Sequence, residues 1–181
     1  MKMWKKLAAC VLAAAMALTL LTACGGGGGG STGGGSGSNS VVRDKTKEDQ
    51  AISWVQEYAA NHGVTLEKSD AVSNAAAAGL PDVVRALDIQ RGAASGDYMA
   101  VFSSATTAMG NSLYSQKKAG VPACFAYKEA DFTKDTIVRT LNAYSGSIMD
   151  QLTNAKISPE TVGAAVTVKD GYVYIVYIIA N

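Results

Sequence analysis

The order of apolar and polar positions predicts three helices in the first half of the folded part of the chain. Apolar residues three and four positions apart predict a helix over residues 46–62, opened by Thr46 in a capping-box-like sequence. An alanine-rich run predicts a second helix over residues 71–78. The Gly-Leu-Pro sequence that follows predicts a break, because proline suits the first turn of a new helix better than the interior of an old one. A third helix is therefore expected over residues 81–89.

Two strands and two helices are expected in the middle of the chain. Short apolar runs predict strands over residues 98–102 and 121–127. Residues 106–118 have helical spacing, although Gly110 weakens the pattern. The most regular helical periodicity lies over residues 137–152, where apolar side chains recur at spacings of one, three and four.

The last part of the folded region has the pattern of a β-hairpin. Residues 162–169 and 172–179 are rich in β-branched and aromatic side chains, and Asp170-Gly171 between them suits a type I′ turn. The second run is apolar at every position, which predicts a strand covered on both faces. We therefore expect an α+β fold, a three-layer α-β-α sandwich with a mainly antiparallel sheet and a C-terminal hairpin.

The N-terminus has the parts of a secretory signal. Three lysines precede an apolar run over residues 7–21, which is shorter than the roughly 20 apolar residues of a spanning helix. Leu21-Thr22-Ala23-Cys24 then resembles the bacterial lipobox, and this resemblance implies cleavage before Cys24 and acylation of its thiol, with palmitate among the chains. The alternative is an ordinary signal peptide with a chance cysteine. The expected domains are a lipoprotein signal peptide over 1–23, a lipidated cysteine with a tether over 24–43, and one globular domain over 44–181.

Residues 25–40 contain only Gly, Ser and Thr apart from Asn39, and such a composition cannot bury enough apolar surface to fold. A flexible chain of this length reaches about 22 Å. The expected location is the cell membrane, with the domain held by its lipid on the extracytoplasmic face of a Gram-positive-like cell. Gly25 leaves an outer-membrane location open in a cell with two membranes.

Composition limits the classes of function. The 181 residues carry 16 basic and 15 acidic side chains, and removal of the signal leaves thirteen against fifteen, a net charge of −2. This balance predicts no nucleic-acid partner. An apolar content of 48% argues against wholesale disorder, and the length suits one domain.

The two ends of the folded part resemble the CAP or SCP superfamily of cysteine-rich secretory, antigen-five and pathogenesis-related proteins. The sequences that carry the resemblance are the helix of residues 136–152, Val162-Gly163-Ala164-Ala165-Val166, Gly171-Tyr172-Val173-Tyr174, and the first helix with its exit Gly63-Val64-Thr65-Leu66. The resemblance implies an α-β-α sandwich with a central groove. Family members often carry two histidines and two acidic residues there, sometimes with a divalent cation. This chain has no histidine near Ser147 or Ile148, and Gly96-Asp97-Tyr98 is its nearest match to the family's Gly-Glu-Asn motif.

Two side chains are candidates for nucleophilic catalysis. His62 is the single imidazole of the chain, and it either acts as a base or caps the C-terminal end of a helix. Cys124 is either a reactive thiol with His62 as its base or a small buried core residue. We expect the second interpretation for both. One imidazole and one thiol on separate elements also predict no transition-metal site and no cofactor.

The other candidates are weaker. Glu129 and Asp131 are close enough in sequence to face one site, but solvated loop carboxylates are commoner. No Gly-x-Ser-x-Gly elbow surrounds the serines, and Ser103-Ser104 and Ser145-Gly146-Ser147 have ordinary helix or loop contexts. The tyrosines of the last strand either line a ligand groove or pack with their hydroxyls at its rim. They are Tyr172, Tyr174 and Tyr177.

Three functions remain at this stage. The first is a membrane-anchored, non-catalytic CAP-like domain that binds a small apolar ligand or an envelope protein. The second is a surface hydrolase with a site that the sequence does not reveal. The third is a structural envelope lipoprotein on an unrelated α/β scaffold. No catalytic, cofactor or metal residue is assigned, and Cys24 is the one assigned site.

Overall fold

A computed structural model describes residues 41–181, and the side chains of all of these except 144–151. The predicted signal, Cys24 and residues 25–40 of the predicted tether lie outside the described residues. Five helical and four extended elements follow in chain order. They are α2 (Lys45–Asn61), β1 (Glu67–Lys68), α3 (Asp70–Arg91), α4 (Tyr98–Ser115), β2 (Gly120–Lys128), the 3-10 turn η1 (Glu129–Asp131), α5 (Lys134–Asn154), β3 (Thr161–Lys169) and β4 (Tyr172–Ala180).

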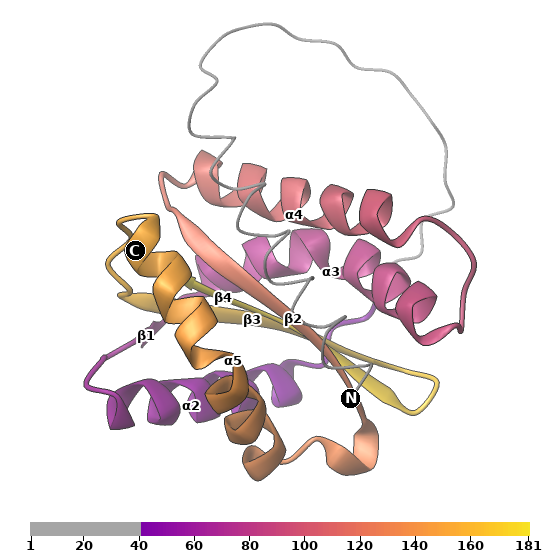
Figure 1. Cartoon of the computed structure of the whole chain (residues 1–181), viewed down its shortest axis with the longest axis horizontal. Coiled ribbons are helices and arrows are strands. Elements are labelled where there is room, and N and C mark those ends of the chain that lie inside the picture. Colours follow the sequence, from indigo (N-terminus) through magenta and orange to yellow (C-terminus); the bar gives the residue numbers. More distant parts are fainter. Residues whose placement is uncertain (1–40) are drawn as a thin grey trace, which may run out of the picture.

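The fold is α+β, as the sequence predicts. The described strands form one sheet in the order β1-β3-β4-β2. The pairs β3–β4 and β4–β2 are antiparallel along nine residues, whereas β1 adds a short parallel pair to β3. Figure 1 shows α3 and α4 on one side of this sheet and α2 and α5 on the other.

Each face of the sheet has its own apolar core, because side chains alternate along the strands. On β4, Val173, Ile175 and Tyr177 pack with α2 and α5. Tyr174, Val176 and Ile178 pack with α3 and α4. The uniform apolar sequence of β4 is thus explained by helices on both faces.

The C-terminal half of the chain matches its predicted elements closely. The hairpin has the expected two-residue turn, with φ of 51° at Asp170 and 72° at Gly171. The strand predicted over residues 121–127 is the centre of β2, and the helix predicted over 137–152 is α5.

The predicted break at Gly79 is wrong, because α3 continues without interruption through Pro81. A Cβ at Gly79 would lie 2.7 Å from the carbonyl oxygen of Ala105 and 2.6 Å from Cγ of Met109. Gly79 therefore allows α4 to approach α3 closely. The packing of α3 against α4 and the sheet outweighs the hydrogen bond that Pro81 removes.

The strand predicted over residues 98–102 is also wrong, since these residues form the first turns of α4. Asp97 caps the helix, and its Oδ1 accepts hydrogen bonds from the amides of Met99 at 2.9 Å and Ala100 at 3.1 Å. The buried face continues from Phe102 to Met109 with helical spacing. A short apolar run cannot distinguish strand from helix, and here the cap decides.

The predicted cap of the first helix is displaced by two residues. Asp44, not Thr46, is the N-cap of α2, and its carboxylate accepts the amide of Lys47 at 3.0 Å. The same bond is the main cause that holds the pKa of Asp44 below its usual value. The short strand β1 had no signal in the apolar pattern.

Candidate functional site

The outer edge of β3 is closed by other elements over most of its length, although β1 pairs with only its first two residues. Farther along, the hydroxyl of Ser73 accepts the amide of Ala164 at 3.2 Å, and Glu48 Oε1 accepts the amide of Val166 at 3.3 Å. The amide of Asp44 donates to Val166 O at 2.8 Å. The first turns of α2 and α3 thus take the place of a neighbouring strand.

The segment just before α2 belongs to the same arrangement. The sequence assigns Val41, Val42 and Arg43 to the end of the tether. In the structure Val41 packs against the core under α3, and the carbonyl of Val42 accepts the hydroxyl of Thr167 at 2.7 Å. The chain therefore enters the folded part along β3, beside the first turn of α2.

Gly163 allows α3 to begin directly on the strand. A Cβ at this position would lie 2.2 Å from the amide nitrogen of Ser73 and 2.5 Å from the carbonyl carbon of Val72. Both are backbone atoms, so the contact cannot be relieved by turning a side chain. The backbone of β3 and the first turn of α3 meet at this glycine.

Glu48 is the buried charge at the centre of this edge, with its side chain only 3% exposed. Arg43 binds it with two nitrogens, Nε to Oε1 at 2.6 Å and Nη2 to Oε2 at 2.9 Å. Lys45 adds an ion pair at 3.0 Å. The carboxylate is thus paired on both oxygens while it also accepts the amide of Val166.

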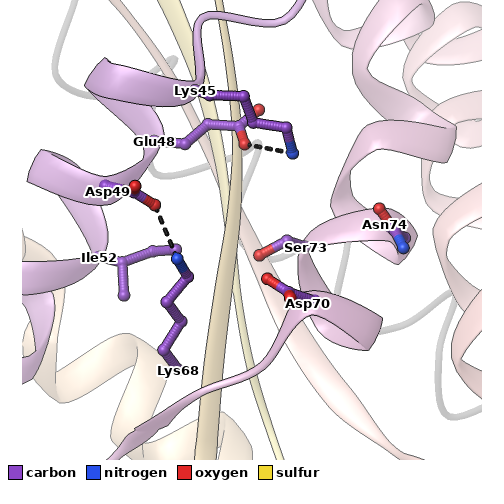
Figure 2. A pocket seen from close by; sticks show the side chains of 8 residues that line it. All are labelled: Lys45, Glu48, Asp49, Ile52, Lys68, Asp70, Ser73 and Asn74. Carbon is purple, nitrogen blue, oxygen red and sulfur yellow. Dashed lines mark hydrogen bonds and ion pairs between the residues drawn. The ribbon is translucent and has the colours of Figure 1, made fainter.

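A pocket of about 370 Å³ lies beside Glu48, between the first turns of α2 and α3. Figure 2 shows the eight residues that line it. They include two lysines and three carboxylates, and the apolar lining is limited to Ile52. The pocket is therefore polar and carries both signs of charge.

The two walls of the pocket carry different sets of charged groups. On one wall Lys68 of β1 forms an ion pair at 2.8 Å with Asp49 of α2, and this hydrogen bond raises the pKa of Lys68. On the other wall Asp70 and Asn74 project from α3 (Figure 2). The amide oxygen of Asn74 accepts Arg43 Nη1 at 3.1 Å.

A second polar cluster lies at the far end of α3, against the hairpin. Asp88 is 4% exposed and receives Lys169 at 2.7 Å, Arg91 at 2.6 Å and the hydroxyl of Tyr174. Burial alone would raise the pKa of Asp88, but the hydrogen bonds from these three partners hold it below its usual value. Burial and the Asp88 carboxylate raise the pKa of Tyr174. The guanidinium of Arg91 covers the ring of Tyr172 at 3.6 Å. Asp88 and Arg91 of α3 thus bind Lys169, Tyr172 and Tyr174 of the hairpin, so the cluster fixes the hairpin to α3.

The structure places His62 and Cys124 on opposite sides of the sheet. His62 caps the C-terminal end of α2, as the sequence predicts, with Nδ1 2.8 Å from the carbonyl oxygen of Tyr58. Cys124 of β2 packs against the cores on the α3 and α4 side. A base and nucleophile pair of these two residues is therefore excluded. Cys124 is half-buried, less than the fully buried position expected for it.

The remaining candidates do not converge on one site. Glu129 and Asp131 lie in η1 and are exposed, and Glu129 pairs with Lys47 at 3.5 Å. Ser104 donates to Asp82 at 2.6 Å on the surface. The prediction that the strand tyrosines place their hydroxyls at a rim is wrong for Tyr174 and Tyr177, which are 0% and 3% exposed. Burial raises the pKa of Tyr177 well above its usual value.

Two negative findings apply to the part of the chain that the structure describes. Among the side chains that the structure describes within residues 41–181, no three His, Cys, Asp or Glu are grouped so that they could hold a metal ion. In the same range no helix combines the length and apolar character needed to cross a membrane.

Sequence reasoning missed the residues of the pocket. Lys45, Lys68 and Asn74 have no motif around them. Their common feature is position, since each lies within the first turns of a helix or in the short strand next to it. The pairing of β1 with β3, across more than 90 residues of sequence, and the bonds of Glu48 and Ser73 to β3 bring these segments together. Comparison with family models, curated proteins and solved structures finds no match to this chain.

Proposed function

We propose that the chain is a lipid-anchored protein on the extracytoplasmic face of the cell membrane, and that its folded part is a non-catalytic binding domain. The observation that carries the location is Leu21-Thr22-Ala23-Cys24, preceded by lysines and an apolar run and followed by a Gly/Ser tether. Cleavage and acylation at Cys24 would leave the domain about 22 Å from the bilayer on average.

Binding is favoured over hydrolysis by the arrangement of the reactive side chains. The sheet lies between His62 and Cys124, and the ring nitrogen Nδ1 of His62 contacts the carbonyl oxygen of Tyr58. A polar pocket with lining groups of both charges is present instead at the edge of β3. Such a pocket has the groups that orient a small ligand, but among the described residues it holds no activated nucleophile.

A distant relation to the CAP superfamily is part of this proposal. It is supported by the resemblance of the two ends of the domain, by helices on both faces of the sheet and by the C-terminal hairpin. The family's histidines have no counterparts here, so the relation implies a binding role in place of a metal-dependent one. A solved structure of the domain with a different strand order from CAP proteins would remove this part of the proposal.

The anchor is tested by Cys24→Ala, with Cys10→Ala as the matched control within the apolar run. Cells producing each form are separated into membrane and soluble fractions, and the N-terminal peptide is weighed by mass spectrometry. We expect the acyl mass and membrane retention of the mature protein in the wild type and in Cys10→Ala. Both should be lost in Cys24→Ala. A wild-type peptide without acyl mass would overturn the proposed location.

A further inference from the structure

We infer that the pocket between α2 and α3 binds a zwitterionic ligand of the size of an amino acid or a dipeptide. This inference deepens the proposed binding function and rests on it. The volume of about 370 Å³ lies in the lower part of the range for small-molecule sites. It suits a compact ligand with few atoms.

The two sides of the pocket differ in charge. The side formed by α2 and β1 carries Lys45 and Lys68, which pair with Glu48 and Asp49 of the same side, whereas Asp70 projects alone from α3 on the facing side (Figure 2). A ligand lying across the pocket would therefore meet ammonium groups and their paired carboxylates at one end and a single carboxylate at the other. Complementary charge of this kind selects partners and fixes their orientation.

Only some of these groups can turn to a ligand. Glu48 already pairs with Arg43, Lys45 and the amide of Val166, so its carboxylate is not available to a ligand. Lys68 and Asp49 are 46% and 63% exposed, and an ion pair so exposed contributes little to stability. A ligand carboxylate can therefore replace Asp49 as the partner of Lys68 at small cost.

The facing side offers a carboxylate that no described side chain pairs with. The side chain of Asp70, in the first turn of α3, forms no hydrogen bond or ion pair with any other described residue, and it acts on Lys68 only through its charge at longer range. Asn74 lies one turn farther along α3, and its amide oxygen accepts one bond from Arg43. A carbonyl oxygen has two lone pairs, so it can accept a second bond from a ligand ammonium.

Ligands that are only anionic, only cationic or only apolar fit the pocket less well than a zwitterion. An anion would approach three carboxylates, and a cation would approach two lysines and the positive ends of two helices. An apolar molecule would contact Ile52 alone among the lining side chains and would desolvate the charged ones. A zwitterion places its carboxylate near Lys68 and Lys45 and its ammonium near Asp70 and Asn74.

The test titrates the full chain, purified in detergent, with four probes by calorimetry or by NMR shifts. The probes are alanyl-alanine, its N-acetyl form, its amide, and the form blocked at both ends. We expect alanyl-alanine to bind at least tenfold more tightly than any blocked form. Asp70→Asn should weaken the binding of alanyl-alanine at least fivefold and leave the affinity for the N-acetyl form unchanged. Lys68→Met should also weaken the binding of alanyl-alanine at least fivefold, but leave the affinity for the amide unchanged.

Asp82→Asn is the matched control. Asp82 lies on the same helix as Asp70, but its carboxylate accepts a hydrogen bond from Ser104 of α4. It should leave all four affinities unchanged. Equal binding of alanyl-alanine and its N-acetyl form would mean a simple anion site and would overturn the inference. Absence of binding by all four probes at 10 mM would also overturn it. Neither outcome affects the fractionation result at Cys24, so failure of the inference and failure of the anchor are distinguishable.

Discussion

Replacement of Glu48 by alanine should destabilise the domain by about 3 kcal/mol. The change removes two short bonds from Arg43, and bonds to charged groups contribute about 1.5–3 kcal/mol each. Arg43 is 20% exposed and Lys45 is 66% exposed, so water recovers much of that loss. The amide of Val166 is left buried without its acceptor, which costs about 1–3 kcal/mol.

Glu48→Gln separates these contributions, because its side-chain oxygen can still accept from Arg43 and Val166. It should cost only about 1–2 kcal/mol, the part due to the lost charge. Glu57→Ala is the matched control. Its ion pair with Lys134 is as short, 2.6 Å, but the two side chains are 53% and 46% exposed. An exposed pair of this kind contributes less than about 1 kcal/mol.

The measurement is urea unfolding of the full chain followed by far-ultraviolet circular dichroism. With a slope of about 2 kcal/mol per molar urea, Glu48→Ala should lower the midpoint by about 1.5 M. A free energy of unfolding for Glu48→Ala that matches Glu57→Ala would refute the reasoning. So would a glutamine variant as unstable as the alanine variant, since the orphaned amide would then have no measurable cost.

Three further outcomes are expected. Gly163→Ala should cost about 3 kcal/mol in thermal unfolding or prevent folding, because its Cβ meets backbone of α3, and a wild-type melting temperature would contradict the close approach. The pKa of Asp88 lies below its usual value of 3.8, so its ionised form stabilises the fold above about pH 4 and this contribution is lost as the pH falls through the folded pKa. Asp88→Asn should therefore lower stability at pH 7 by about 2 kcal/mol and flatten its decline in acid, and parallel pH curves for the two proteins would count against this. Native Cys124 should react with a thiol reagent at least tenfold more slowly than in urea, because it is half-buried in a core, and equal rates would show that the core does not protect it.

The local sequence correctly predicted the elements in which the same apolar pattern recurs over many residues. The hairpin has an alternation of β-rich runs and a two-residue turn that accepts positive φ, and both appear in the structure at Asp170 and Gly171. The long periodicity of α5 is of the same kind. The uniform apolar character of β4 correctly predicted helices on both faces of the sheet.

The errors arose where packing outweighs a local signal. Gly79 and Pro81 normally end a helix, but here the glycine serves the contact with Met109 of α4. The apolar run at residues 98–102 was too short to distinguish strand from helix without the cap at Asp97.

The pocket could not be predicted from the sequence for a different reason. Its walls meet through the two-residue pairing of β1 with β3 and through the side-chain bonds of Glu48 and Ser73 to the outer edge of β3. Neither a two-residue strand nor a bond between a side chain and a distant amide leaves a periodic pattern. Asp70 and Lys68 therefore looked like ordinary solvated charges.

The strand order has a consequence for the sequence of events in folding. The two central strands, β3 and β4, follow every other element in the chain, yet both cores pack against them. The earlier helices and β2 therefore lack their main packing surface until residues 161–180 have been synthesised. The ribosome must release nearly the whole domain before both cores can form, and contacts between segments more than 90 residues apart make that step slow. A chain with this topology cannot complete either core before its last hairpin is made, and a polypeptide without a completed core can be threaded through a narrow translocation channel.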